Sequence, residues 1–131
     1  ESLGKELGIY TDPYQRFGAL TAELHRALRL VLDVGIHVKG WSRERAIGFS
    51  LMHEAADKAG TIAEIERYMA IPGQALSYKI GALKIRELRE KYAKELGAKF
   101  RLSSFHDAVL SEGSLPLAVL EQKMARWAKE Q

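Results

Sequence analysis

Two polar side chains, Gln74 and Tyr78, share one face of a predicted helix whose first half is otherwise apolar on both sides. Pro72 carries the φ angle of a first helical turn and lacks the donor that would go unpaired there, so the sequence predicts a helix from Pro72 to Leu96. A helix that is apolar all round is buried, and buried polar groups need hydrogen-bond partners. Gly81 leaves room beside the phenol ring for a ligand, whereas a core tyrosine with one hydrogen bond is the plainer interpretation.

A second polar stripe runs along the preceding long helix, which the sequence predicts from Pro13 to His37 with Asp12 as its N-cap. Its members follow one another at steps of three, four and four residues: Arg26, Arg29, Asp33 and His37. Apolar residues border the stripe closely, which favours a cleft or a neighbouring helix over open solvent. Asp33 lies one turn before His37, so its carboxylate is placed to hold one imidazole nitrogen. The helix macrodipole also favours a histidine at this end, and that interpretation stays open.

Helix-capping and helix-ending residues predict the remaining elements. The opposite face of the helix from Pro13 to His37 is expected to pack in the core through Phe17, Leu20, Leu24, Leu28, Val31 and Gly35. Shorter helices are predicted at 1–7, 43–56 and 62–70, at a segment capped by Ser104, and from Pro116 onward. Gly60 is expected to end one helix, and Thr61 with Glu64 to form a capping box for the next. No segment alternates with period two, so an all-α fold of about seven helices, two of them long, is expected in one domain over residues 1–131.

Composition excludes several classes of function. The formal charge of +3 comes from 20 basic and 17 acidic residues that are well mixed, so no nucleic-acid partner is expected. No apolar run approaches the ~18 residues of a membrane span. The chain has no cysteine, which excludes disulfides and thiolate metal sites. It begins at Glu1, inside a segment that already has a helical pattern, and we expect it to be part of a larger protein.

One segment imitates a metal motif. His53-Glu54-Ala55-Ala56-Asp57 starts like the HExxH of zinc peptidases, but Asp57 stands where the second histidine is required. Zinc needs both imidazoles on one helix face, one turn apart. We therefore expect no metal site in this chain, and we expect His53 and Glu54 to lie on a solvated face.

Several strings resemble the C-terminal part of the bacterial family named domain of unknown function 885. They occur in the family's order and cover essentially the whole chain: Asp12-Pro13-Tyr14, 26–37, Gly40-Trp41-Ser42, 67–81, Phe105-His106-Asp107 and Leu115-Pro116-Leu117. That family is similar to zinc metallopeptidases of the gluzincin type, with an HExxPGH motif and a later E-G-W-A-x-Y-x-E segment. Both lie upstream of this chain, and Glu1 matches the last glutamate of the second.

The resemblance implies that this chain is the substrate-facing wall of a larger helical metallopeptidase-like fold. Zinc and a peptide substrate would belong to the full-length parent, and the fragment alone would be inactive because it lacks the metal ligands. Apolar area around Leu76 and Ile80 would then lie open, and a homodimer of the fragment would cover it. Export to the periplasm is expected if the missing part carries a signal.

The resemblance also implies roles for individual residues. Tyr78 and His37 suit a donor that stabilises the oxyanion of the transition state. Arg67 suits a substrate carboxylate, because its fork binds carboxylates in a bidentate way. Five further residues complete the expected site. Gln74 and Tyr68 would touch the substrate, and Asp33, Arg26 and Glu1 would support these side chains. The alternative is a non-catalytic helical domain that binds another protein.

Overall fold

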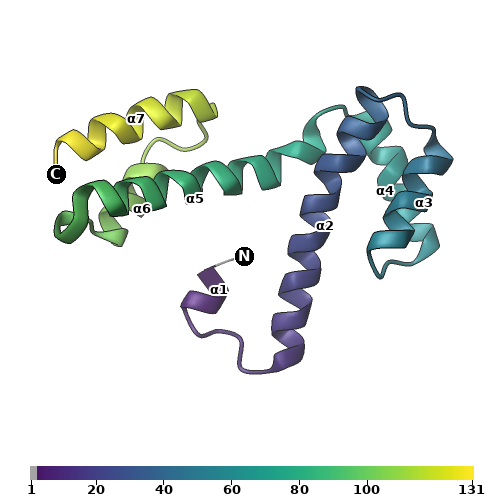
Figure 1. Ribbon diagram of the computed structural model, residues 1–131, viewed down its shortest axis with the longest axis horizontal. Coiled ribbons are helices and arrows are strands. Elements are labelled where there is room, and N and C mark those ends of the chain that lie inside the picture. The colour runs from purple at the N-terminus through teal and green to yellow at the C-terminus, as the bar shows by residue number, and fades with distance from the viewer. Residues whose placement is uncertain (1–2) are drawn as a thin grey trace. The chain divides into compact units, whose positions relative to one another are not determined.

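The computed structural model describes residues 3–131, and these residues form helices and loops without a strand. Figure 1 shows the order of the elements: α1 (Leu3–Glu6), α2 (Pro13–His37), α3 (Arg43–His53), α4 (Lys58–Ala70), η1 (Gln74–Leu76), α5 (Ser77–Leu96), η2 (Gly97–Lys99), α6 (Leu102–Leu110) and α7 (Leu117–Lys129). The predicted all-α class is confirmed, and the two longest helices are α2 and α5.

Contacts within the chain group it into two compact units, residues 1–79 and residues 80–131. Each unit has its own cluster of buried apolar side chains. The first turn of α5 belongs to the first unit and the rest of α5 to the second. The single domain expected over residues 1–131 stays a prediction.

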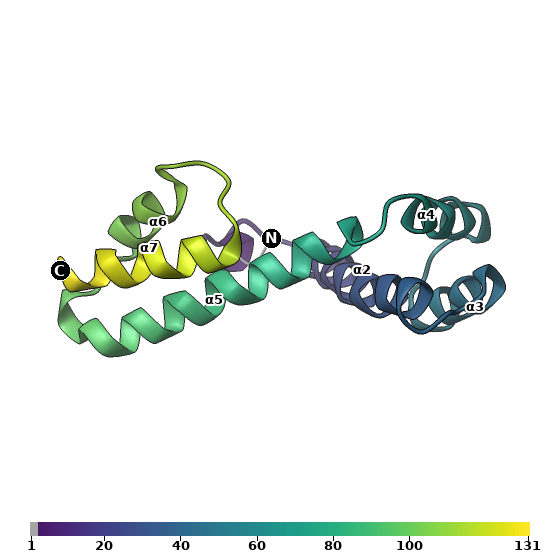
Figure 2. The ribbon, with the colours of Figure 1, turned by 90° about the horizontal axis from the view of Figure 1, so that it is seen from above.

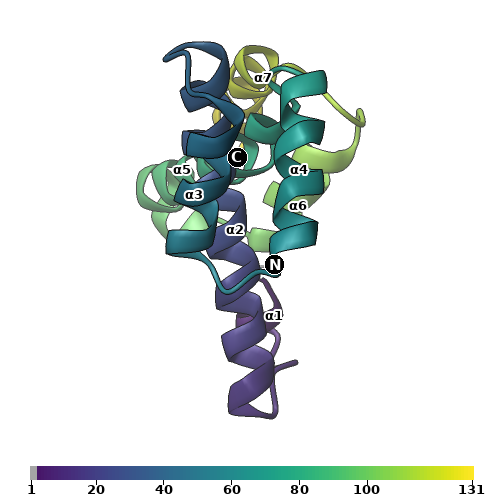
Figure 3. The same cartoon turned by 90° about the vertical axis from the view of Figure 1, so that its right-hand side faces the viewer.

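In the first unit, α3 and α4 pack against the C-terminal half of α2 (Figure 3). The helix α2 begins as predicted, because the Asp12 carboxylate accepts a hydrogen bond from the Tyr14 backbone N–H at 2.6 Å. Its buried core draws on four elements and consists of Leu28, Leu32, Ala46, Ile47, Ile65, Tyr68 and Ala75.

The predicted core stripe of α2 is largely wrong. Phe17 is 67 % exposed, and three other members of the stripe are also exposed: Leu20, Leu24 and Val31. Only Leu28 and Gly35 are buried, and they share the interior with Arg29, Leu32 and Asp33. The physical reason is that α3 and α4 cover only the C-terminal half of α2 and contact a neighbouring face of it. Two charged residues of the polar stripe are therefore inside the first unit.

The junction between α3 and α4 differs from the prediction. The helix α3 ends at His53 and α4 begins at Lys58, with Asp57 as its N-cap. The Asp57 carboxylate accepts from the Gly60 backbone N–H at 2.8 Å, so Gly60 lies in the first turn of α4 and does not end a helix. Asp57 is an earlier and strong cap, and it takes the place of the predicted Thr61 capping box.

Pro72 does not start a helix. It lies in a turn with Gly73, whose φ of +81° is in the left-handed region that glycine adopts without strain. The 3₁₀ helix η1 starts only at Gln74, and α5 starts at Ser77. The Gly73 N–H donates to the Asp33 carboxylate at 2.9 Å, which fixes this turn against α2.

The second unit packs α5, α6 and α7 around one core (Figure 2). Its buried side chains are Leu88, Tyr92, Phe105, Leu120 and Met124. The last helix follows Pro116, as predicted, but α6 begins at Leu102 rather than at a Ser104 cap. The Ser104 hydroxyl instead accepts from the Trp127 indole N–H at 3.3 Å, and this contact between helices explains the difference.

Candidate functional site

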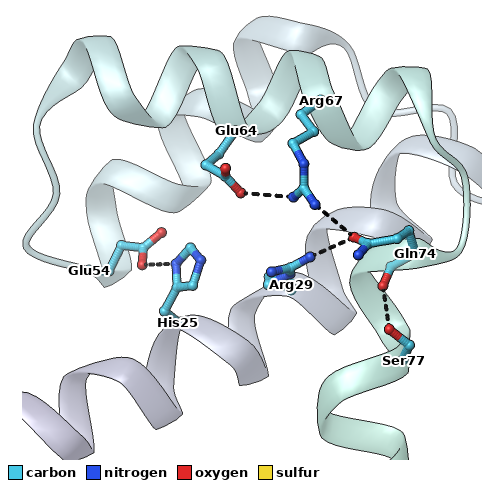
Figure 4. A network of polar contacts seen from close by, with 7 residues as sticks. All are labelled: His25, Arg29, Glu54, Glu64, Arg67, Gln74 and Ser77. Carbon is cyan, nitrogen blue, oxygen red and sulfur yellow. Dashed lines mark hydrogen bonds and ion pairs between the residues drawn. The ribbon is translucent and has the colours of Figure 1, made fainter.

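The polar residues of the first unit gather around Arg29. We call the group formed by Arg26, Arg29, Arg67, Tyr68, Gln74 and Tyr78 the Arg29 cluster. Its members come from α2, α4, η1 and the first turn of α5. Figure 4 shows that Arg29, Arg67 and Gln74 point toward one another from three of these elements. Five of the site residues predicted from the sequence lie in this cluster, and Arg29 itself was not among them.

Aromatic rings cover the guanidinium group of Arg29. Its central carbon lies 5.1 Å from the centre of the Tyr68 ring and 4.6 Å from that of the Tyr78 ring. Arg26 contributes a second guanidinium, 4.7 Å from the Tyr78 ring centre. A cation over an aromatic face is attracted by the ring quadrupole, so these contacts hold Arg29 and Tyr78 together.

One side-chain oxygen links two arginines. Gln74 Oε1 accepts from Arg29 Nη2 at 2.9 Å and from Arg67 Nη2 at 3.3 Å (Figure 4). Arg67 Nη1 also pairs with the Glu64 carboxylate at 3.4 Å. The Ser77 hydroxyl donates to the Gln74 backbone carbonyl at 2.8 Å and holds η1 at the start of α5.

Asp33 and His37 both bond to backbone groups. The spacing predicts that Asp33 holds the His37 ring, but the Asp33 carboxylate accepts from the Gly73 N–H instead. His37 Nε2 lies 3.0 Å from the Tyr68 carbonyl oxygen. His37 follows Arg29 by eight residues, about 12 Å along the helix axis. It therefore meets the cluster at the backbone of Tyr68, while the other predicted residue Glu1 lies outside the described part of the chain.

Tyr78 is more exposed than the sequence predicts. Tyr78 is 43 % exposed, although its position in the half of the helix that is apolar on both sides predicts burial. Ile80 and Leu83 on the same helix are exposed too, whereas Leu76, which was also expected to lie open, is half-buried. The Tyr78 ring rests on two guanidinium groups and remains reachable from solvent.

Tyr68 has a buried hydroxyl without a hydrogen-bond partner among residues 3–131. Burial, and then the nearby Glu64 carboxylate, raise the pKa of this hydroxyl well above its ordinary value. Tyr68 therefore stays neutral at physiological pH and is a donor.

An ion pair that the sequence does not predict joins α2 to the residue after α3. His25 Nδ1 lies 2.7 Å from Glu54 Oε2 (Figure 4). The Ser50 hydroxyl donates to Glu54 Oε1 at 2.5 Å. The Glu54 side chain is only 8 % exposed, so the predicted solvated face is wrong for Glu54. His53 is exposed, as expected, and stacks on Phe49.

Two hollows meet at the His25–Glu54 pair. A small cavity of about 70 Å³ is lined by both residues and by the Tyr68 side chain. A wider and more open groove of about 490 Å³ runs along α2 and is lined by Phe17, Gly18, Thr21, Ala22, His25, Arg26 and Glu54. No local sequence pattern indicates this pair, because its partners are 29 residues apart.

The described residues do not fit a zinc ion. No group of three or more histidine, aspartate and glutamate side chains within residues 3–131 is arranged to hold a metal. In the same part of the chain, no helix combines the length and the apolar character that a membrane span requires.

Comparison with known proteins identifies relatives of the chain. The family model described as "Bacterial protein of unknown function (DUF885)" matches residues 1–124. A solved structure from Colwellia psychrerythraea, described as a "putative lipoprotein", is 48% identical in sequence and superposes with a TM-score of 0.96. The match covers 99% of this chain and 22% of that one, so the chain spans about a fifth of the length of this neighbour. Among curated proteins, none matches the chain.

Proposed function

The chain belongs to the bacterial DUF885 family, and from this premise we propose that it forms the substrate-facing wall of a larger zinc-dependent peptidase. The length of the solved neighbour supports a longer parent, since this chain matches only 22% of it. The zinc and its ligands would belong to the rest of the parent, because the described residues do not fit a metal ion. The chain's own contribution is to bind and orient a peptide.

One observation carries the proposal: four elements place a phenol, an amide and three guanidinium groups together in the Arg29 cluster. Groups of this kind bind the parts of a peptide. Guanidinium groups bind carboxylates, an amide pairs with a backbone N–H or C=O, and a phenol donates to a developing oxyanion.

Within this proposal, Tyr78 is the donor to the oxyanion. Its ring is fixed by Arg26 and Arg29, and its residue is partly exposed, so the hydroxyl is held at the surface where a substrate would lie. Arg67 and Gln74 bind the substrate beside it. His37 supports Tyr68 through the Tyr68 carbonyl oxygen, and Asp33 supports Gln74 through the backbone of Gly73.

The test is Tyr78→Phe in the full-length zinc-loaded protein, assayed for hydrolysis of short peptides. Loss of an oxyanion donor is expected to lower kcat by ~100-fold or more with little change in KM. Tyr92→Phe is the matched control, because it removes a phenol hydroxyl from the core of the second unit. A near-normal kcat in Tyr78→Phe would show that Tyr78 does not stabilise the oxyanion. Absence of peptide hydrolysis by the full-length parent would refute the proposed peptidase function.

A second candidate function has its own observation. The exposed apolar residues of α2, with Phe17, Leu20 and Leu24 among them, offer a surface for another protein or for a second copy of the chain. A non-catalytic interaction domain would use this surface and leave the Arg29 cluster idle. The Tyr78→Phe assay separates the two functions. We also propose that the protein is exported to the cell envelope, because its solved neighbour is described as a lipoprotein.

A further inference from the structure

Arg29 is a buried cation with an incomplete set of partners. The residue is only 5 % exposed, and among residues 3–131 its Nε has no hydrogen-bond partner. Within residues 3–131, its side chain makes one hydrogen bond, from Nη2 to Gln74 Oε1. No carboxylate within residues 3–131 forms a salt bridge with its guanidinium. Since buried charges are normally paired, the surroundings of Arg29 lack an anion.

The nearest acidic residue along the helix does not supply this anion. Asp33 lies one turn after Arg29 and is also buried, but its carboxylate is turned to the Gly73 backbone N–H. The rings of Tyr68 and Tyr78 lie over the guanidinium and offer no acceptor oxygen to Nε. The donor without an acceptor is therefore the Nε–H, on one edge of the guanidinium.

The geometry of a guanidinium defines what fits this edge. Nε–H and one neighbouring Nη–H point in parallel, and the two oxygens of a carboxylate accept from both. The Gln74 amide has one oxygen, so it satisfies Nη2 and leaves Nε unfilled. Arg67 directs a second guanidinium at the same oxygen from 3.3 Å. A single neutral acceptor thus stands where two cations converge.

We propose that Arg29 and Arg67 bind the free C-terminal carboxylate of a peptide, with the Gln74 side chain giving up its place to the carboxylate. This assignment rests on the proposed function, because a peptide is the substrate proposed there. The C-terminal carboxylate is the one anionic group that every unmodified peptide offers. Arg67 is partly exposed and Gln74 is only half-buried, so the carboxylate reaches Arg29 from the surface.

The test is a titration of the 131-residue chain with three ligands, followed by the NMR signal of the Arg29 Nε–H. The first ligand is N-acetyl-trialanine, whose only charge is the C-terminal carboxylate. The second is N-acetyl-trialanine amide, which carries no charge. The third is N-acetyl-Ala-Asp-Ala amide, whose only charge is the side-chain carboxylate. The first ligand is expected to shift the signal and the other two are not. Equal binding of the uncharged amide, or of the aspartate peptide, would overturn the assignment.

Gln74→Glu is the sharpest variant, because it supplies the second oxygen from within the chain. It is expected to raise the melting temperature and to weaken binding of N-acetyl-trialanine by about 10-fold or more. Arg29→Lys is expected to weaken binding by a similar factor, since an ammonium cannot replace the fork. Arg43→Lys is the matched control, because Arg43 is already paired with Glu66 at 2.6 Å on the exposed surface.

Unchanged peptide binding in Gln74→Glu would overturn the proposal. If Arg29→Lys does not fold, Gln74→Glu still decides, since it adds a stabilising contact. Failure of this inference is distinct from failure of the proposed function. If the chain binds N-acetyl-trialanine and its amide equally and the full-length parent hydrolyses peptides, the carboxylate site is refuted and the proposed peptidase function stands. If the chain binds only N-acetyl-trialanine and the full-length parent does not hydrolyse peptides, the carboxylate site stands and the proposed peptidase function is refuted.

Discussion

A single methyl group added at Gly35 is expected to destabilise the first unit, although glycine is a poor helix former. Gly35 is a buried residue in the last turns of α2. A Cβ built on it would lie 2.6 Å from Trp41 Cε3 and 2.7 Å from Trp41 Cδ2. These atoms are in the middle of the indole, so the ring must move as a whole to make room.

The magnitude follows from two opposing terms. Replacing glycine by alanine inside a helix contributes about 1 kcal/mol of stability. Overpacking costs about 1–3 kcal/mol, and the upper part of that range applies where a neighbour cannot move. The backbone N–H of Trp41 donates to the Gly35 carbonyl at 2.9 Å. The centre of its ring lies 5.2 Å from the centre of the Phe49 ring and 4.5 Å from the central carbon of the Arg45 guanidinium, so Trp41 is restrained on several sides. The net loss in Gly35→Ala is therefore about 1–2 kcal/mol.

Gly18→Ala is the matched control in the same helix. Nothing lies within 4 Å of a Cβ at Gly18, so only the helix term acts. This variant is expected to gain about 0.5–1 kcal/mol. The two substitutions are chemically identical and should have opposite effects on stability. Because of Trp41, they should differ by about 1.5–3 kcal/mol.

The assay is equilibrium urea unfolding followed by tryptophan fluorescence in a Trp127→Phe background. Trp127 belongs to the second unit, so the remaining signal from Trp41 reports on the first unit by itself. Gly35→Ala with a stability equal to or above that of its parent would show that Trp41 yields easily, and the steric reasoning would be wrong. A loss of stability in Gly18→Ala would contradict the helix term.

Two further predictions concern buried polar groups of the first unit. Because burial and the nearby Glu64 carboxylate raise the pKa of Tyr68, the unfolded chain releases this proton at a lower pH than the folded chain. The free energy of unfolding should therefore fall as the pH rises above about 10. Tyr68→Phe should remove that slope without lowering stability at neutral pH, as urea unfolding at stepped pH will show; an unchanged slope would mean that another group titrates. Glu54→Gln should lower the free energy of unfolding by about 1.5–3 kcal/mol, because it breaks a charged hydrogen bond in a buried site. Glu66→Gln at an exposed pair should change it little, and equal losses in the two variants would count against the buried pair.

Local chemistry made much of the fold predictable. Asp12 followed by Pro13 predicts the start of α2, and the structure confirms it. Pro72 and Ser104 misled the prediction, because a stronger local or tertiary contact was available in each case. Gly73 turns the chain against Asp33, and the Ser104 hydroxyl bonds to Trp127.

The sequence predicted most residues of the Arg29 cluster, but it did not predict that Arg29 lies at its centre. Arg67 and Gln74 are in direct contact, and both Arg26 and Tyr78 adjoin Arg29. That these residues bind a substrate stays a prediction. The burial of Arg29 could not be foreseen, because it depends on which face of α2 meets the other helices. The same limit applies to the His25–Glu54 pair.

The bond between Arg29 and Gln74 joins residues that are 45 positions apart, and the bond between Asp33 and Gly73 spans 40. Closing such long loops costs entropy that local helix formation does not, so these contacts should form after α2 itself. On the ribosome, α2 emerges well before η1 exists. During that interval Arg29 and Asp33 lie on an uncovered helix and remain hydrated. The first unit can therefore bury its two charges only when synthesis has passed Gln74, which makes the turn at Gly73 the step that completes the fold of this unit.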